Sequence, residues 1–368
     1  MISAKPLSAL RSDRRPHLGA LAAAAMMALS SLTAGCSETT ATARMASSRR
    51  IPAGQRGHFR DQLDVSTFQR GNVHTHTRES DGDHEPEDVY AWYRDHGYNF
   101  LAVTDHNKLT DPRRYRSLER PGFVIIRGEE LTLKGGGNHV HVNALCHRRR
   151  IGGKKFASVE DALRWGVQRT LQEGGIALVN HPNFYWAFDA DSFPAAKGAH
   201  MLEVWSGHPH VHPDGDWRHP SVEAMWDTSL SNGMDLAATA VDDMHNLSAV
   251  GDPRHSGPGR GWIDVFAQQA SEGEICNAMA RGWFIASNGV RLTRLTVRGD
   301  TISVLPQAAG GVVEWIGRGG AVLARQSVDP WMQRPNVYRL RGGEDYVRAR
   351  ITAPSGARAW TQAYRVVY

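Results

Sequence analysis

The chain has 368 residues, of which 43 are Lys or Arg, 38 are Asp or Glu and 41% are hydrophobic. This balance is typical of a folded globular protein and excludes an intrinsically disordered, collagen-like or coiled-coil chain. The net charge of +5 does not indicate a nucleic-acid partner, because residues 1–36 contribute +3 of it. Of the 18 histidines, 16 lie between His74 and His255 and none follows His255. We therefore expect histidine side chains to have a specific role in the middle of the chain.

The N-terminal segment resembles a bacterial export signal. Three arginines precede an apolar run over residues 18–32, which is shorter than the roughly 20 residues that span a bilayer. The run ends in small residues directly before Cys36, and this sequence resembles a lipoprotein cleavage site. We expect residues 1–36 to be a signal peptide with a lipobox, Cys36 to carry the lipid and residues 37–67 to be a flexible tether. The mature protein would be a periplasmic or cell-envelope lipoprotein that meets the membrane only through its lipid anchor; secretion with cleavage at another site is the alternative.

From residue 68 to residue 289 the sequence alternates short apolar runs with amphipathic stretches, which is the pattern of a parallel α/β domain. Capping and stop residues predict helices over residues 86–97, 158–174, 220–232 and 269–281. Short apolar runs predict strands over residues 99–103, 123–126, 140–146, 176–179, 201–205 and 236–241. Alternating residues and glycine-rich turns then predict a small all-β module over residues 290–368, with strands over residues 291–297, 312–316, 346–351 and 363–367.

Side chains that bind metals follow nearly every predicted strand of the first domain, where parallel α/β barrels place their active sites. His74 and His76 are two residues apart, so both imidazoles project from one face of an extended segment. The further strand-end motifs are Thr104-Asp105-His106, Gly128-Glu129-Glu130, His139-Val140-His141, Asn180-His181-Pro182, Leu202-Glu203-Val204 and Asp242-Asp243-Met244-His245. One such motif alone is weak, since a single strand-end Asp is usually a helix cap. Their succession predicts a cluster of divalent metals held by imidazoles and carboxylates.

The order of these motifs is similar to that of the polymerase and histidinol phosphatase (PHP) superfamily over residues 70–250. His-x-His, Ser-Asp-Gly, Thr-Asp-His, Gly-x-Glu, His-Pro and Asp-x-His follow one another as in that family. Asn107, the turn Gly207-His208-Pro209 and the trailing β module resemble its carbaryl-hydrolase-like branch. The resemblance implies a distorted (β/α)7 barrel of PHP type with up to three metal ions, followed by the small C-terminal all-β module.

The resemblance also assigns the metal ligands. His74, His76, Glu130 and Asp243 would hold the first ion, Glu130 would bridge to a second ion with His141 and His181, and Asp81, His106 and His245 would hold the third. Position 81 is Asp where other branches of the family have His, which leaves the occupancy of the third site open. The cofactors would be two or three divalent ions of Mn, Fe or Zn. Gly-x-Glu spacing selects Glu130 and turns Glu129 to the other face, while His139 shares a face with His141 as a supporting residue or substitute ligand.

A cluster of divalent metals predicts hydrolysis. A hydroxide that bridges two metals forms near neutral pH and attacks an electrophilic centre, and Asp243 is the candidate catalytic residue that handles its proton. We expect a phosphoesterase that acts on small phosphate mono- or diesters. A carbamate or carboxylic ester hydrolase is the alternative, because such a hydroxide attacks carbon as well as phosphorus. Nucleic acid is not an expected partner, and a non-catalytic metal-binding or recognition protein is the remaining class.

Two residues are candidates for substrate binding. His208 lies in a loop rich in His and Pro, and Arg254 closely follows proposed ligands, as a phosphate-binding cation would. For His208 the alternative is a surface loop without a binding role. For Arg254, and for the other basic candidates Arg78 and Lys108, the alternative is solvated surface charge. The sequence leaves open whether Cys146 and Cys276 form a disulfide or remain separate thiols.

Overall fold

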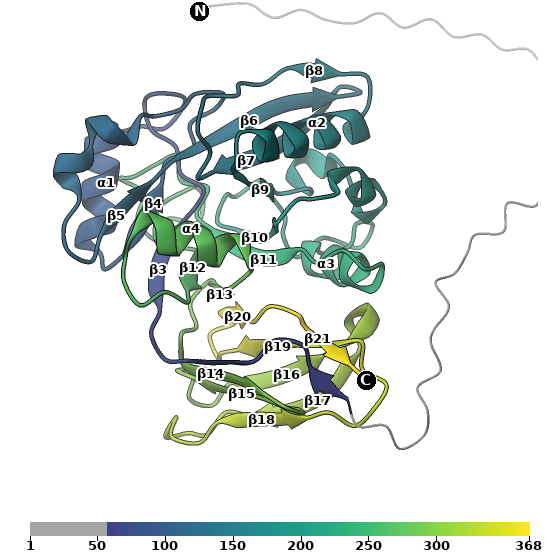
Figure 1. The fold of residues 1–368 in the computed structure, drawn as a ribbon. Helices are drawn as coiled ribbons and strands as arrows, with labels where there is room; N and C mark the ends of the chain where they lie inside the picture. The colour runs from purple at the N-terminus through teal and green to yellow at the C-terminus, as the bar shows by residue number, and fades with distance from the viewer. Residues whose placement is uncertain (1–56) are drawn as a thin grey trace, which may run out of the picture. The chain divides into compact units, whose positions relative to one another are not determined.

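The computed structural model describes residues 57–368, and its elements are shown in Figure 1. The predicted signal peptide, the predicted lipidation site Cys36 and residues 37–56 of the predicted tether lie outside the described residues. Within the described part, no helix combines the length and the apolar character needed to cross a membrane.

The helices of the first part lie where the sequence predicts them. They are α1 (Pro86–Asp95), α2 (Val159–Gln172), α3 (Val222–Ser231) and α4 (Glu272–Ala280). Ser158, Ser221 and Ser271 each accept a hydrogen bond from a backbone N–H in the first turn of α2, α3 and α4. α1 begins at Pro86, which lacks an N–H that the first turn would leave unpaired anyway. The capping residues therefore set where these helices begin.

Two sheets position the metal-binding motifs. One has the order β11-β10-β9-β7-β6-β8. Its strands are β6 (Gly128–Gly135), β7 (Asn138–Leu145), β8 (Lys155–Phe156), β9 (Ile176–Val179), β10 (Met201–Ser206) and β11 (Ala237–Val241). The other sheet contains the parallel strands β3 (Gln69–Asn72), β4 (Phe100–Ala102) and β5 (Val124–Ile126), and continues on the other side of β3 through the antiparallel strands β12 (Trp262–Val265) and β13 (Phe284–Ser287).

The described strands do not close into the (β/α)7 barrel that the resemblance implies. β6 and β7 pair antiparallel, because the Gly136-Gly137 turn reverses the chain without a crossover helix. β7 and β9 also pair antiparallel. Single bridges from Thr75 to Met244 and from His106 to Glu130 connect the two sheets. The fold is therefore mixed α/β, and these bridges gather the segments that follow β3, β4, β5 and β11.

The C-terminal part consists of β-strands, as the alternating pattern predicts. They are β14 (Leu292–Arg298), β15 (Thr301–Pro306), β16 (Val312–Ile316), β17 (Val322–Ser327), β18 (Asn336–Arg339), β19 (Tyr346–Thr352), β20 (Arg358–Trp360) and β21 (Tyr364–Val367). Trp315, Val313 and Leu295 are fully buried in the core of this part. β20 pairs with β13, so one sheet crosses the boundary predicted at residue 289.

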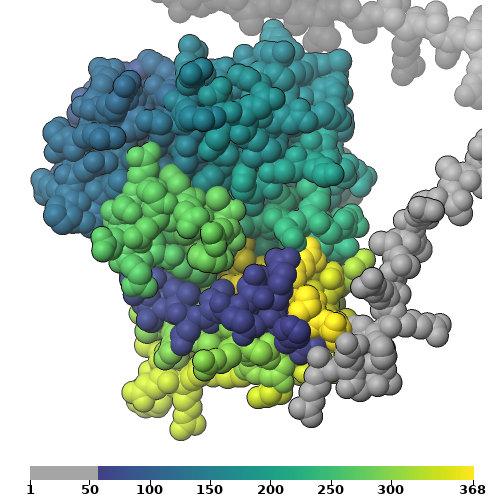
Figure 2. Space-filling view, in the orientation of Figure 1, coloured from purple at the N-terminus to yellow at the C-terminus, as the bar shows by residue number. Residues whose placement is uncertain are grey.

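Part of the predicted tether is folded. β1 (His58–Phe59) pairs with β21, and β2 (Leu63–Val65) pairs with β14. The Phe59 side chain is fully buried among the C-terminal strands, and Figure 2 shows this purple segment lying against the green and yellow ones. The prediction of a flexible tether was wrong for residues 58–65, because two short edge strands complete the C-terminal sheets through backbone hydrogen bonds that a polar composition does not reveal.

Cys146 and Cys276 form a disulfide, with their Cα atoms 6.1 Å apart. Cys146 directly follows β7 and Cys276 lies in α4, so the bond ties this helix to the strand end. Both cysteines pack against a buried apolar cluster that includes Ile275 and Met279 of α4. The bond thus answers the question that the sequence leaves open.

Candidate metal centre

The segment after β3 turns His74 and His76 into the interior. The His74 N–H donates to Asn72 Oδ1 at 2.9 Å, and the His76 N–H donates to the carbonyl of Met244 at 2.8 Å. The two side chains are 0% and 1% exposed, and their ring centroids are 5.1 Å apart. The His-x-His spacing therefore brings both imidazoles together, as predicted.

Glu130 and Asp243 lie between these two histidines. Glu130 Oε2 is 3.2 Å from His74 Nε2 and 3.3 Å from His76 Nε2, and Asp243 Oδ1 is 3.2 Å from each of the two nitrogens. Ligand atoms bonded to one ion at about 2.1 Å lie roughly 3.0–3.4 Å apart, so these four atoms are spaced as a metal shell requires. Asp243 has a left-handed φ of 49°, a strained conformation of the kind that clusters at functional sites.

Glu130 also faces a second group of imidazoles. Its Oε1 atom is 2.8 Å from His141 Nδ1 and 3.5 Å from His181 Nε2, and its Oε2 atom is 3.1 Å from His106 Nδ1. The His181 ring is stacked on the His74 ring with centroids 5.6 Å apart. The two oxygens of one carboxylate thus contact different histidines, which is the arrangement that a bridging ligand needs.

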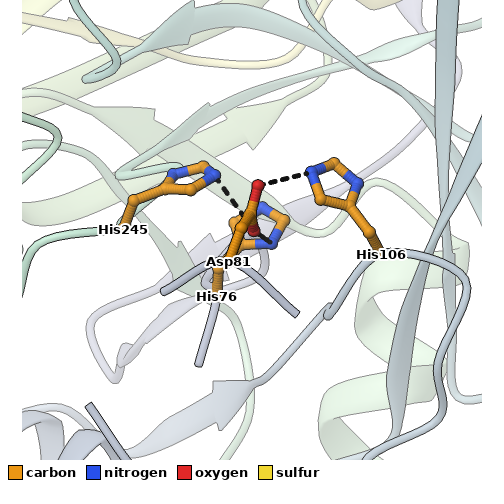
Figure 3. A group of neighbouring side chains, drawn as sticks. All are labelled: His76, Asp81, His106 and His245. Carbon is orange, nitrogen blue, oxygen red and sulfur yellow. Dashed lines mark ion pairs between the residues drawn. The ribbon is translucent and has the colours of Figure 1, made fainter. Parts of the chain in front are cut away.

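Asp81 joins His76, His106 and His245 at the edge that faces solvent (Figure 3). Asp81 Oδ2 is 3.3 Å from His106 Nε2, and Asp81 Oδ1 is 3.5 Å from both His245 Nε2 and His76 Nδ1. The loop that carries Asp81 passes so close to His76 that a Cβ at Gly82 would lie 2.7 Å from the His76 carbonyl. The Asp81 side chain is 52% exposed, whereas the Glu130 side chain is 1% exposed, so the centre opens to solvent on this side.

The cluster fits divalent metals. Buried atoms without a hydrogen-bond partner include His74 Nε2, His76 Nε2, Glu130 Oε2 and both ring nitrogens of His141. Such atoms are costly to bury unless another partner satisfies them. Among the described residues, the ion pairs of Asp81, Glu130 and Asp243 are formed with histidines alone. Imidazole nitrogens with carboxylate oxygens suit Mn, Fe or Zn, and such cations would satisfy both the orphaned atoms and the negative charge.

The pKa shifts show how strongly these carboxylates attract positive charge. Burial alone would raise the pKa of Glu130, but His74 and the neighbouring imidazoles hold it well below its usual value. The pKa of Asp243 is lowered in the same way against burial by His74 and His76. Burial would lower the pKa of His76, but the nearby carboxylates of Asp243 and Glu130 raise it to about 10. Protons and metal ions therefore compete for the same nitrogens.

Glu203 is a buried acid at the centre that sequence reasoning did not assign. Its Oε1 atom is 2.5 Å from His74 Nδ1, and its Oε2 atom accepts a hydrogen bond from the His181 N–H at 3.1 Å. The residue is 1% exposed on β10. A carboxylate behind a ligand histidine fixes the ring so that its other nitrogen faces the metal. The available signal was an acid inside an apolar strand, where a carboxylate needs a partner.

Three other buried polar residues support the centre. Asn180 Nδ2 donates to Glu130 Oε1 at 2.8 Å and to Asn143 Oδ1 at 2.9 Å. Asp105 accepts four hydrogen bonds from the loops after β3 and β4, so its oxygens are already satisfied. Asp242 accepts from the Tyr93 hydroxyl at 2.6 Å and from the backbone N–H groups of residues 259–261. These residues position loops around the ligands.

Glu129 and Glu130 point in opposite directions, as the strand register predicts. Glu129 accepts hydrogen bonds from the backbone N–H groups of Ile151 at 2.8 Å and Gly152 at 2.7 Å. These contacts tie the loop before β8 to β6. Glu129 also lies 3.4 Å from His147 Nε2 through its Oε2 atom, so it has structural partners of its own, whereas Glu130 faces the histidines of the metal-binding cluster.

The basic residues expected to bind a phosphate are all occupied by acidic neighbours. The Arg254 side chain is 82% exposed and pairs with Asp252 at 2.8 Å, and its contact with substrate stays a prediction. Arg78 pairs with Glu85 at 3.3 Å, and Lys108 pairs with Glu79. Their charges are neutralised locally in surface turns.

His208 does lie beside the centre, within a row of aromatic rings. Its ring centroid is 5.4 Å from that of His245 and 5.8 Å from that of Phe184. Phe184 is in turn 5.2 Å from His181. His139 packs against Phe184 at 5.7 Å and is outside the groups of mutually close ligand atoms. An aromatic rim therefore borders the metal-binding cluster.

No family model matches the chain, and no curated protein matches it. One similar solved structure is a two-domain protein from Bacteroides vulgatus that contains a predicted PHP-like metal-dependent phosphoesterase; it is 16% identical with a TM-score of 0.45, over 84% of this chain and 99% of that chain. Another is a proposed metal-dependent phosphoesterase from Bifidobacterium adolescentis, 15% identical with a TM-score of 0.36, over 48% of this chain and 87% of that one. A third is an amidohydrolase from Chromobacterium violaceum with bound sulfate and no metal. It is 18% identical with a TM-score of 0.35, over 48% of this chain and 88% of that chain. Because each TM-score is below 0.5, we base the function on the residues of this chain.

Proposed function

We propose that the chain is a metal-dependent hydrolase of PHP type that acts on small phosphate mono- or diesters. The observation that carries this proposal is the cluster of imidazoles and ionised carboxylates around Glu130, which contains orphaned buried ligand atoms. A purely structural cluster would satisfy these atoms with its own hydrogen bonds. Divalent metals bound there would lower the pKa of a coordinated water and stabilise negative charge on the substrate oxygens.

Nine residues would hold the metals. They are His74, His76, Asp81, His106, Glu130, His141, His181, Asp243 and His245. Glu203 would keep His74 oriented through its contact with Nδ1, and Asn180 would hold Glu130 Oε1. Asp243, with Oδ1 between His74 and His76, would hold the proton of the attacking water at a carboxylate oxygen. The open side at Asp81 would admit the substrate.

Hydrolysis of a carbamate or carboxylic ester is the second candidate, and two observations favour it. Arg78, Lys108 and Arg254 are each paired with an acidic neighbour, so a multiply charged phosphate would find few free cations there. Phe184 instead places an aromatic ring beside His181. An uncharged substrate with an apolar group suits such a border better than an anion does.

A hydrolysis screen separates the two candidates. The metal-loaded protein is assayed with p-nitrophenyl phosphate, bis(p-nitrophenyl) phosphate, p-nitrophenyl acetate and an aryl N-methylcarbamate, each with and without chelator. We expect the highest kcat/KM on a phosphate ester, and loss of that activity with chelator. A higher kcat/KM on the acetate or carbamate would favour the second candidate, and absence of any metal-dependent hydrolysis would contradict both.

We propose in addition that the protein is exported and anchored through a lipid on Cys36. The disulfide between Cys146 and Cys276 supports this proposal, because disulfides persist in oxidising compartments outside the cytosol. Cys36→Ser is expected to move the protein from the membrane fraction to the soluble fraction of the cell envelope. Unchanged partitioning of the variant would contradict lipidation.

A further inference from the structure

His208 occupies a fixed place at the border of the metal-binding cluster. It follows β10, where the Gly207 N–H donates to the carbonyl of Val241 at 2.9 Å. A Cβ at Gly207 would lie 2.9 Å from the Asp242 carbonyl, so the turn runs tightly along the segment that carries Asp243. The His208 ring lies between the rings of His245 and Phe184. Backbone contacts therefore hold this side chain beside the ligands.

The hydrogen bond behind the His208 ring defines its protonation state. The backbone N–H of His210 donates to His208 Nδ1 at 3.2 Å. A ring nitrogen that accepts a hydrogen bond carries a lone pair and no proton. The His208 ring is therefore neutral, and its single proton is on Nε2.

Two of the proposed ligands show the opposite arrangement. His74 Nδ1 faces Glu203 Oε1 at 2.5 Å, and His245 Nδ1 faces the Asp243 carbonyl at 2.9 Å. Each of these acceptors requires a proton on Nδ1, which leaves a lone pair on Nε2 for a metal. His208 has a donor behind its ring, so metal binding through Nε2 would place two N–H groups face to face. This contrast excludes His208 from the ligand set.

We propose that His208 binds the substrate as a neutral hydrogen-bond donor, through Nε2–H, to an oxygen atom of the ester that is hydrolysed. This inference rests on the proposed function, because it requires an ester beside the metals. This role differs from that of a cationic side chain, which attracts negative charge. A neutral imidazole instead selects a substrate whose hydrogen-bond acceptor lies in the correct position. The donor is available at neutral pH without any change in protonation.

A pair of near-isosteric substitutions tests the position of the donor. In His208→Gln the side-chain amide NH2 lies near the place of Nε2, whereas in His208→Asn it lies near the place of Nδ1. We expect His208→Gln to keep kcat/KM within about 5-fold of wild type, and His208→Asn and His208→Ala to lose about 10- to 100-fold, the range for a hydrogen bond to a charged oxygen. Metal content is expected to stay at the wild-type value in all three variants. Trp217→Ala, on the same loop and 83% exposed, serves as a control.

The same variants are titrated with inorganic phosphate by calorimetry, which requires no turnover. His208→Asn is expected to weaken phosphate binding by about 10-fold and His208→Gln to weaken it less. Equal behaviour of the Gln and Asn variants, or loss of metal in either, would overturn the inference. If the wild-type protein binds metal but hydrolyses no ester, the proposed function fails, and the phosphate titration still decides whether His208 donates to an oxyanion.

Discussion

Two clusters of buried ionisable side chains lie in different parts of the molecule, and they balance charge in opposite ways. Where α3 meets β19, Arg348 is 1% exposed, donates to Asp227 at 2.9 and 2.6 Å and pairs with Glu223 at 2.7 Å. The guanidinium keeps its charge at all ordinary pH values. Among the described residues, the cluster around Glu130 pairs its carboxylates with imidazoles and with no Arg or Lys. Buried acids paired with a permanent cation indicate packing, whereas clustered buried acids that have no such cation and keep an unsatisfied oxygen, as Glu130 does, indicate a site for a bound cation.

The same contrast appears in the composition of the two regions. Residues 290–368 contain 12 Arg, no Lys or His and 5 acidic residues, whereas residues 68–289 contain 22 basic and 29 acidic residues. The pairs that join the regions are Arg291–Asp264, Arg348–Asp227, Arg348–Glu223, Arg350–Glu223, Arg358–Asp214 and Arg365–Asp235. Arginines of the C-terminal part thus form ion pairs with acidic residues of the first part. Their excess does not by itself indicate that the protein binds an anionic partner.

The largest effect is expected at the cluster that lacks a permanent cation. Glu130→Gln removes the carboxylate that faces both groups of histidines, so it is expected to release metal and to lower kcat/KM by on the order of 1,000-fold, since bound metals contribute several kcal/mol to transition-state stabilisation. Glu129→Gln is the matched control and is expected to keep the metal, because Glu129 contacts the loop before β8 and His147, and neither belongs to the proposed metal ligands. Metal analysis and steady-state kinetics check this pair. If Glu129→Gln lost more metal than Glu130→Gln, the assignment of Glu130 to the metal-facing side of β6 would be refuted.

The cluster with a permanent cation is expected to affect stability and not metal binding. Arg348→Met leaves Asp227 and Glu223 buried without their cation, which costs about 3–5 kcal/mol of the free energy of unfolding. The folded fraction should still hold the wild-type amount of metal. Chemical denaturation and metal analysis of the same samples measure both quantities. The triple variant Arg348→Met/Asp227→Asn/Glu223→Gln should recover part of the loss, and a triple variant no more stable than Arg348→Met would argue against stranded charge as the cause.

The disulfide lies wholly within the first part, so its removal tests that region alone. Cys146→Ser/Cys276→Ser releases a loop with a sequence separation of 130. The expected loss is about 2–4 kcal/mol in the free energy of unfolding. Thermal unfolding of the oxidised wild type and of the variant measures it. Equal stabilities would show that the loop is already constrained by the packing of α4.

The smallest effect is the acid sensitivity of the contact between the regions. Burial would raise the pKa of Glu223, but Arg348 and Arg350 outweigh it and lower the pKa below 4.5. A lowered folded-state pKa contributes stability that is present above about 4.5 and is lost as the pH falls through the folded value. The free energy of unfolding, measured by denaturation at each pH from 6 to 3, is therefore expected to fall more steeply with decreasing pH for wild type than for Glu223→Gln. If the free energy of unfolding changes with pH equally in both proteins, Glu223 does not contribute to the acid sensitivity.

The sequence was sufficient for the main helices and for naming nine side chains that the structure brings together, because caps and strand-end motifs are local signals. The role of these side chains as metal ligands stays a prediction. Serine caps and Pro86 marked the helices, and His-x-His spacing put His74 and His76 on one face. Sheet topology was not readable, since the glycine turn after β6 looks the same in a hairpin as in a connection to a helix. The folded strands β1 and β2 were missed because their partners lie more than 200 residues away.

Supporting residues depended on contacts that spacing does not encode. Glu203 stands 129 positions from His74, and only the folded chain shows that its carboxylate lies behind that ring. The pairing of Arg254 with Asp252 is likewise invisible in its nearness in sequence to His245, and substrate binding by Arg254 stays a prediction. The sequence thus identified the side chains that cluster around Glu130 better than the residues that hold those side chains in place.

The metal content of the purified protein is the most direct test of the contrast between the two clusters. Elemental analysis of wild type, Glu130→Gln and Arg348→Met, each normalised to folded protein, compares the two clusters in one experiment. We predict about two to three equivalents of Mn, Fe or Zn in wild type and in Arg348→Met, and a clear loss in Glu130→Gln. Less than about one equivalent in wild type after growth and reconstitution with these metals would contradict the account.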